Sequence, residues 1–311
     1  MEENNTTSPS EFILLGFYEW AHLQIILFSI FLVVYIMALT GNLTIFVVIL
    51  SSPNLHTPMY FFLSNLSILD ITLTSSIMPK LLDICLTENH SITYIGCFTQ
   101  VVFFVICVVA EYFLLAVMAY DRYAAICCPL RYSTLMKMET CLQLALSSWG
   151  LGVLESVVLA GVISRHPFTK SKKINHLYCD MKALLKLSNS STQYAELTIL
   201  VSGVIFGFLP LFFILVTYVF VIYSILKIRT KEGKSKAFST CSSHLTVITL
   251  FFGIVLSMYM RPKSAYSIEQ DKILSVLYTS LIPTLNPIIY SLRNKDVHVA
   301  IKKLRLKFSR T

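Results

Sequence analysis

The residues that could do chemistry in this chain are a few charged side chains within apolar sequence. Asp121, Arg122 and Tyr123 follow an apolar run, 98–119, whose one charge is Glu111. An acid–base pair where a helix leaves a membrane is costly unless it faces protein or water. Two interpretations are open: an interfacial anchor, or a switch in which the carboxylate holds the arginine until a partner competes for it.

Two further carboxylates, Asp70 and Glu111, each lie near the middle of an apolar run, roughly 20 Å from the flanking loop. Two carboxylates at that depth are unfavourable unless they share a proton, a cation or water. No nucleophile or third ligand accompanies them, which argues against metal-assisted catalysis. No Cys/His spacing indicates zinc, no Ser/His/Asp or Cys/His set converges, and we expect neither an enzyme nor a cofactor.

The elements that must position these residues are predicted from composition. Hydrophobic residues make up 55% of the 311 residues and charged residues 14%, against roughly 25% charged in soluble domains. Seven runs are nearly free of charge and long enough to cross a bilayer as helices, and none alternates like a barrel strand. The sequence predicts one all-α integral membrane domain, a bundle of seven helices at approximately 23–50, 58–86, 97–126, 141–163, 196–228, 235–260 and 271–292.

The distribution of charge predicts the orientation of this bundle. Residues 1–22 contain acids but no Lys or Arg, whereas 15 of the 25 basic residues fall on segments between spans that would face the cytoplasm and on the tail, 293–311. Basic residues favour the cytoplasmic side. We therefore expect residues 1–22 outside and 293–311 inside, with span one an uncleaved anchor. The net charge of +8 reflects topology, and no nucleic-acid-binding motif is present.

Cysteines and glycosylation motifs agree with this topology. Of eight cysteines, Cys97 and Cys179 are the two clearly on outer segments, where an oxidising compartment would pair them. Cys85, near the outer end of span two, is the remaining candidate. Asn4 and Asn5 each begin an Asn-X-Thr motif on the outer segment and are the expected glycosylation sites.

Span seven contains a break close to its inner end. Pro287 removes a backbone hydrogen bond, and a kinked helix can act as a two-state element, although a simple structural kink is the alternative. Asn42, Asp70 and Asn286 are polar and lie at similar depth in three spans. We therefore expect a buried polar network linking spans one, two and seven.

Four long motifs, in order along the chain, carry a family resemblance. They are Leu55–Ser67 (LHTPMYFFLSNLS), Met118–Cys127 (MAYDRYAAIC), Lys236–Leu245 (KAFSTCSSHL) and Pro283–Asn294 (PTLNPIIYSLRN). Over about residues 12–306 the chain resembles a vertebrate olfactory (odorant) receptor of the tetrapod-type second class, among the rhodopsin-like G-protein-coupled receptors.

The resemblance implies a plasma-membrane receptor that binds small, largely hydrophobic volatile molecules and activates a stimulatory olfactory-type G protein to raise cAMP. Membrane lipid is a further partner, and arrestin is a candidate one. The resemblance also assigns residues. It places the ligand against Phe104, Val105, Val108, Val109, Tyr112, Ser202, Phe206, Phe252, Val255, Leu256, Tyr259, Tyr278 and Thr279. It assigns the G-protein switch to Asp121, Arg122, Tyr123, Tyr218, Asn286, Pro287 and Tyr290.

The resemblance bears on three further points. It favours a monovalent cation, rather than a shared proton alone, at Asp70 and Glu111. Phe104 stands where amine receptors of the wider superfamily have an aspartate, which disfavours a cationic amine ligand. The family usually has two more cysteines in outer loop two, where this chain has Thr169 and Asn189, so one disulfide is absent and the shape of the loop is left open.

Residues after Asn294 predict a short amphipathic helix on the inner leaflet. Val297, Ile301, Leu304 and Phe308 share one face, and the basic residues among them suit anionic lipid. A solvated basic tail is the alternative.

Other functions remain as alternatives to an odorant receptor. The nearest is a chemoreceptor of the same family acting outside the olfactory epithelium. A small-solute transporter would also have buried carboxylates, but the chain shows neither a repeat between its halves nor an interrupted helix pair.

Overall fold

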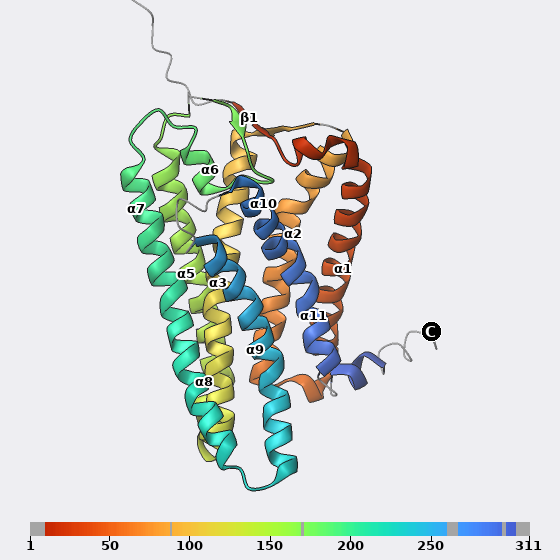
Figure 1. Cartoon of the computed structure of the whole chain (residues 1–311). Helices are drawn as coiled ribbons and strands as arrows, with labels where there is room; N and C mark the ends of the chain where they lie inside the picture. The colour runs from red at the N-terminus through yellow and green to blue at the C-terminus, as the bar shows by residue number, and fades with distance from the viewer. Residues whose placement is uncertain (1–9, 88, 169–170, 260–266, 294–296, 303–311) are drawn as a thin grey trace, which may run out of the picture.

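The computed structural model is a bundle of long helices that carries a small β-sheet at one end (Figure 1). It describes residues 10–87, 89–168, 171–259, 267–293 and 297–302. Seven helices in these ranges are long and apolar enough to cross a membrane, which confirms the predicted fold class. Asn4, Asn5 and Thr169 lie outside the described residues, as do residues 303–311.

The elements follow one another in this order along the chain. They are β1 (Glu11–Leu14), η1 (Tyr18–Leu23), α1 (Gln24–Ser51), η2 (Pro53–Leu55), α2 (Pro58–Thr87), β2 (Ser91–Thr93), α3 (Tyr94–Cys127), η3 (Pro129–Arg131), α4 (Tyr132–Leu135), α5 (Met138–Ser164), β3 (Lys173–Ile174), α6 (Met181–Leu185), α7 (Gln193–Ser202), η4 (Gly203–Phe208), α8 (Leu209–Lys227), α9 (Lys231–Tyr259), α10 (Ile268–Val276), η6 (Leu277–Leu281) and α11 (Ile282–Arg293). The longest connection between spans is the one from α5 to α7. Residues 297–302 form a further helical turn after α11.

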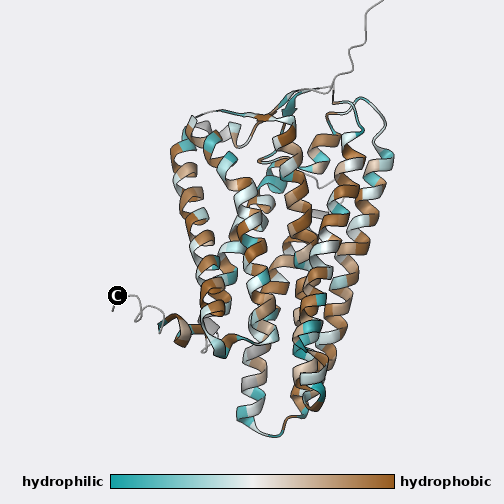
Figure 2. Cartoon of the chain, turned by 180° about the vertical axis from the view of Figure 1, so that it is seen from behind, coloured by the Kyte–Doolittle hydropathy of each residue, from teal (hydrophilic) through white to brown (hydrophobic). Residues whose placement is uncertain are grey.

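The surface of the bundle is apolar along the length of the helices. Figure 2 shows hydrophobic residues over most of each helix and hydrophilic residues gathering at the two ends. Large apolar side chains such as Ile25 on α1, Val157 on α5 and Phe212 on α8 are exposed on the outside of the bundle. Such apolar side chains suit hydrocarbon rather than water. The backbone of a helix is also compatible with hydrocarbon, because its hydrogen bonds are satisfied within the helix.

The sheet joins three segments that are distant in sequence. β1 lies in the centre, antiparallel to β2 and parallel to β3. Beyond it the chain turns at Gly16, whose φ of +58° suits glycine. The Gly16 carbonyl accepts a hydrogen bond of 2.8 Å from the buried Lys272 ammonium of α10. The sheet end therefore ties the N-terminal segment to the start of the seventh span.

A disulfide between Cys97 and Cys179 connects the start of α3 to the long loop between α5 and α7. This confirms the predicted pairing, and Cys85 is a buried free thiol. The backbone N–H of Cys179 also donates to Gln100 Oε1 at 3.2 Å. Loop and helix are thus held together by a covalent and a polar contact at the same place.

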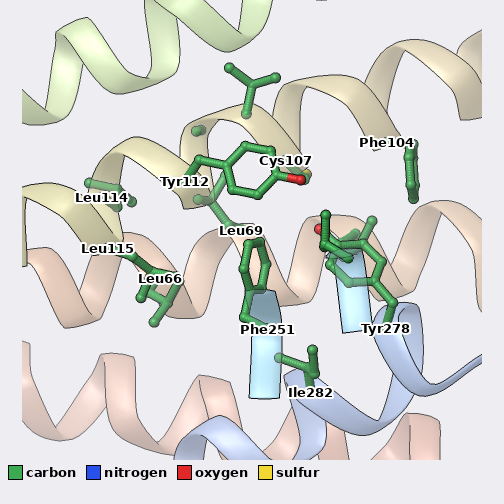
Figure 3. Close-up of a cluster of buried hydrophobic side chains, with 14 of the residues drawn as sticks. Leu66, Leu69, Phe104, Cys107, Tyr112, Leu114, Leu115, Phe251, Tyr278 and Ile282 are labelled. Atoms are coloured by element: carbon green, nitrogen blue, oxygen red, sulfur yellow. The ribbon is translucent and has the colours of Figure 1, made fainter. Parts of the chain in front are cut away.

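Helix α3 lies in the middle of the bundle, packed against α2, α5 and α8. It can approach α5 closely because residue 152 is glycine: a Cβ there would be 2.6 Å from the Ile106 carbonyl oxygen. The core around α3 is filled by side chains from several helices, and Figure 3 shows Tyr112, Phe251 and Tyr278 among them.

Two spans contain a feature that the sequence did not predict. The fifth runs from α7 through the π-helical turn η4 into α8, and the seventh from α10 through the π-helical turn η6 into α11. Pro210 and Pro283 each occupy the second position of the α-helix that follows. A proline has no N–H to donate, which suits a local change of hydrogen-bonding pattern at these turns.

Candidate functional site

A cavity of about 1210 Å³ lies between α3, α5, α6, the α7–η4–α8 span and α9. Most predicted ligand-contacting residues line it, and they come from three different spans. They are Phe104, Val105, Val108, Val109, Tyr112, Ser202, Phe206, Phe252, Val255 and Leu256. The helical spacing on span three therefore brings one face of α3 to the cavity.

Aromatic side chains form the part of the wall between α3 and α9. Tyr112 stacks on Phe252, with ring centroids 5.4 Å apart, and meets Phe251 edge-on at 5.2 Å. Phe206, which also lines the cavity, meets Phe113 of α3 edge-on, with ring centroids 6.2 Å apart. Such pairs are rigid apolar surfaces with few polar atoms, so a neutral apolar molecule could be buried against them without leaving a polar group unpaired.

Three predicted ligand residues do not appear in this wall. Tyr278 is buried in η6 against Phe104 and Phe251. The Thr279 hydroxyl donates to the Ser275 carbonyl at 2.8 Å within its own helix. The side chain of Tyr259 lies outside the described residues. Among the described residues, the seventh span thus contributes packing beside the cavity rather than lining.

Sequence reasoning missed the lining contributed by the loop between α5 and α7. Met181 and Leu185 of α6 face the cavity, and Lys182, Lys186, Ser188 and Ser190 give its loop side a polar character. Asp180 begins α6 by accepting a hydrogen bond from the Ala183 N–H at 3.0 Å. An aspartate directly before a short, largely apolar run is a typical helix start, so Asp180 could have indicated this helix from the sequence.

A buried acid was also missed. Glu155 lies in the middle of α5, is 6% exposed, and accepts a hydrogen bond from the hydroxyl of Ser202 on α7. Ser202 lines the cavity, and so does Leu159, one turn beyond Glu155 on α5. The available signal in the sequence was Glu155 itself, a single acid within the apolar run 142–163, which indicates a polar partner on a neighbouring span.

His176 lies in the same loop, buried beside α10. Its Nε2 is 3.3 Å from the Ser275 hydroxyl, and its ring meets Tyr178 edge-on. Burial lowers the pKa of His176, and this effect outweighs the opposing effect of the Asp180 and Asp271 carboxylates. The imidazole is therefore neutral at physiological pH.

The polar network that the sequence predicted around Asn42, Asp70 and Asn286 is present. Asn286 Nδ2 donates to Asp70 Oδ2 at 2.9 Å, and Asn42 Nδ2 donates to the Pro283 carbonyl at 2.8 Å. Both contacts are buried, and they join the first, second and seventh spans as the sequence predicted. Each donor satisfies an acceptor that would be costly to leave unpaired in an apolar interior.

Asp70 and Glu111 lie close enough to interact electrostatically, and Cys107 is beside both. Within the described residues, Asp70 Oδ1 and Glu111 Oε1 have no hydrogen-bond partner. Orphaned carboxylate oxygens fit either a shared proton or a bound monovalent cation. No group of three or more His, Cys, Asp or Glu side chains in the described ranges could hold a metal ion.

At the opposite end of α3 from the sheet, Arg122 is paired with its neighbour Asp121. Both Nε and Nη2 of the guanidinium donate to Asp121 Oδ2. Tyr132 of α4 donates its hydroxyl to Asp121 Oδ1 at 2.8 Å. Asp121 is fully buried, and these two partners stabilise its charge. Burial and the Asp121 charge raise the pKa of Tyr132, which therefore stays a donor.

The other predicted switch residues lie on α3, α8 and α11. Tyr123 contacts Phe220 of α8 edge-on, and the Tyr218 hydroxyl lies 2.7 Å from His244 Nδ1 of α9. Tyr290 is buried on α11, and its hydroxyl has no hydrogen-bond partner among the described residues. Pro287, three residues before it, packs against Gly41 of α1. The region thus contains one buried hydroxyl that could gain a partner.

Comparison with known proteins agrees with this arrangement. The sequence profile of the family described as "Olfactory receptor" matches residues 31–307. The chain is 47% identical over 304 residues to human olfactory receptor 8G1, covering 98% of each chain. It is 47% identical over 304 residues to mouse olfactory receptor 5AP2, covering 98% of this chain and 96% of that one. It is 45% identical over 304 residues to human olfactory receptor 8D1, covering 98% and 99% respectively.

Seven helices able to span a membrane, a disulfide that ties α3 to the loop after α5, and a cavity between the spans are the features of a seven-helix receptor. Within that class the chain belongs to the olfactory receptor family of G-protein-coupled receptors, as the resemblance in its four motifs implied. Members of this family are multi-pass membrane proteins and are not enzymes. The prediction that the chain is not an enzyme is therefore confirmed.

Proposed function

We propose that this receptor binds small, largely hydrophobic volatile molecules in the cavity and activates a stimulatory olfactory-type G protein, raising cAMP. The observation that carries the proposal is the course of α3. One face of this single helix, from Phe104 to Tyr112, lines the cavity, and its far end holds the Asp121–Arg122 pair. A ligand and a cytoplasmic partner could therefore both act on the elements that pack against α3.

The proposed ligand class follows from the lining. The part of the cavity between α3 and α9 is formed by aliphatic and aromatic side chains. Burying apolar ligand surface there contributes roughly 25 cal/mol per Å², less the cost of association. Potencies in the micromolar range or weaker are expected. In this proposal the sheet end faces outside, with Asn4 and Asn5 glycosylated, and the Arg122 end faces the cytoplasm.

Ligand and G protein would be coupled through a shift between two states. A ligand can shift them only if its affinity for the two states differs. In the state described here Asp121 holds Arg122, and Tyr132 donates a hydrogen bond to Asp121. Tyr290 has a buried hydroxyl without a described partner. We assign this arrangement to the inactive receptor, from which Arg122 and Tyr290 would move to meet the G protein.

A cAMP reporter in transfected cells tests the proposal. Wild-type receptor, exposed to a panel of volatile compounds, should raise cAMP for at least one of them. Arg122→Ala should reach the surface and give little cAMP with the same agonist. Arg131→Ala is the matched control, since Arg131 is exposed on the same side of the bundle. Equal responses from wild type and Arg122→Ala would show that the Asp121–Arg122 pair is only an anchor.

We also propose that Asp70 and Glu111 hold a monovalent cation that favours the inactive state. The two orphaned carboxylate oxygens support this assignment. Replacing sodium by choline in isolated membranes should then raise basal coupling in wild type and leave Asp70→Asn unchanged. A basal signal that is independent of sodium would instead favour a shared proton.

A further inference from the structure

The buried pair Glu155–Ser202 joins a hydroxyl that lines the cavity to a carboxyl on α5, and the odorant-binding proposal gives Glu155 no role. Glu155 is a carboxyl in the middle of a membrane-spanning helix, a placement that is expensive without a partner. Its described partner is Ser202, which reaches it from the neighbouring span. The same cavity is also lined by apolar residues, among them Val108, Leu159 and Phe206.

Ser202 differs from Thr198 on its own helix and from Ser156 on α5 in where its proton goes. Thr198 on α7 donates to the Tyr194 carbonyl at 2.8 Å, and Ser156 on α5 donates to the Val153 carbonyl at 2.8 Å. Both bonds stay within one helix. Ser202 donates instead to Glu155, across the interface between α5 and α7. Its position, where α7 passes into the π-helical turn η4, places the hydroxyl at the cavity wall.

The direction of this bond decides what Ser202 can offer a ligand. A hydroxyl has one proton to donate and two lone pairs that accept. The proton is committed to Glu155, and donation to a carboxyl group makes the serine oxygen a better acceptor. Toward the cavity Ser202 can therefore accept a hydrogen bond but has no proton left to give.

We propose that the Glu155–Ser202 pair selects ligands that donate a hydrogen bond, namely neutral alcohols and phenols, over ethers and carbonyl compounds of the same skeleton. The proposal rests on the proposed odorant-binding function of the cavity. Glu155 itself is not among the lining residues. An ammonium group would thus lose its water without reaching the carboxylate, and a neutral hydroxyl fits better.

The experiment compares matched alcohols and their methyl ethers, on linear, terpenoid and phenolic skeletons, in the cAMP assay at equal surface expression. For each responsive skeleton the alcohol should be about tenfold more potent than the ether, the effect of one hydrogen bond. Ser202→Ala should remove that difference by weakening the alcohol and sparing the ether. Thr198→Ala deletes a hydroxyl on the same helix that does not line the cavity, and should change neither.

Glu155→Gln separates recognition from packing. The amide keeps the shape of the side chain and can donate its own N–H to the Ser202 oxygen, which frees the serine proton for the ligand. Ethers should then gain potency relative to alcohols, a change that a merely structural role for Glu155 would not produce. Glu139→Gln, at the exposed start of α5, is the matched control.

The outcomes distinguish this inference from the function on which it rests. Equal potency of alcohols and ethers in wild type, or an equal loss of both in Ser202→Ala, would overturn the selection by Glu155–Ser202 while leaving the odorant-binding function intact. An expressed receptor that responds to no compound of any class would overturn the proposed function itself.

Discussion

Replacing Gly152 by alanine should destabilise the receptor, although glycine is a poor helix former. The ideal Cβ at residue 152 lies 2.6 Å from the Ile106 carbonyl oxygen, and ordinary contact begins at 3.4 Å. Moving from one distance to the other separates α3 and α5 locally by about 0.8 Å. The obstacle is backbone rather than the end of a flexible side chain, so the helices themselves must shift.

The magnitude follows from two opposing terms. Overpacking in a well-packed interior costs about 1–3 kcal/mol, while glycine to alanine in a helix gains about 1 kcal/mol. Gly150 and Gly161 on the same helix have no heavy atom within 4 Å of their ideal Cβ positions. Gly150→Ala and Gly161→Ala therefore carry the propensity gain alone. The difference between these controls and Gly152→Ala isolates the contact, at about 1–3 kcal/mol.

Thermal unfolding in detergent, followed with a thiol-reactive fluorescent dye, measures this difference. The free thiols of Cys107 and Cys141 are buried and become reactive when the bundle opens. At about 2 °C per kcal/mol for a chain of this size, Gly152→Ala should melt roughly 2–6 °C below Gly150→Ala. If the two variants melt at the same temperature, the close approach of α3 and α5 does not limit stability and the reasoning fails.

Three further predictions concern the cavity and the segments at the sheet end. Cys97→Ser should lose surface expression, measured by antibody staining. The reason is that the disulfide closes a loop of 82 residues and is worth about 4 kcal/mol. Reactive thiols at both Cys97 and Cys179 in surface receptor would contradict the pairing. Val108→Phe should lower the potency of bulky agonists more than that of small ones, because Val108 lines the cavity, and a uniform change in dose–response curves would place the ligand elsewhere. Because the pKa of His176 is lowered from 6.5 by burial, the unfolded chain binds more protons and the free energy of unfolding should fall as pH drops below 6.5. His176→Gln should flatten that fall in melting temperature, and an unchanged pH slope would assign the effect to other groups.

The seven helices could be predicted from local pattern, whereas the residues of the cavity were implied by the resemblance to the family. Runs without charge mark the spans, and helical spacing on span three brings Phe104, Val108 and Tyr112 to one wall. The disulfide followed from the predicted topology, since few cysteines lie on the segments predicted to be outside. The spans and the disulfide require no knowledge of how one span packs against another.

The features that sequence reasoning missed depend on contacts between spans or on loop structure. Glu155 has a role only because α7 brings Ser202 to it. Tyr278 and Thr279 lie in η6, and a π-helical turn changes which face later residues present. Met181 reaches the cavity because the loop is anchored by β3 and the disulfide. None of these contacts leaves a periodic signal in its own segment.

The restraints on α3 indicate which helices could carry a ligand signal. At one end α3 is fixed by the disulfide, and along its length the Gly152 contact leaves no space toward α5. By contrast α11 follows a π-helical turn and contains Pro287, and α9 is joined to α8 through the polar contact of His244 with Tyr218. A polar contact can exchange partners and a helix can bend at a proline, whereas close backbone packing allows neither. A ligand bound between α3 and α9 would therefore act mainly by moving α9 and α11 relative to a fixed α3, which changes the partners available to Arg122 and Tyr290.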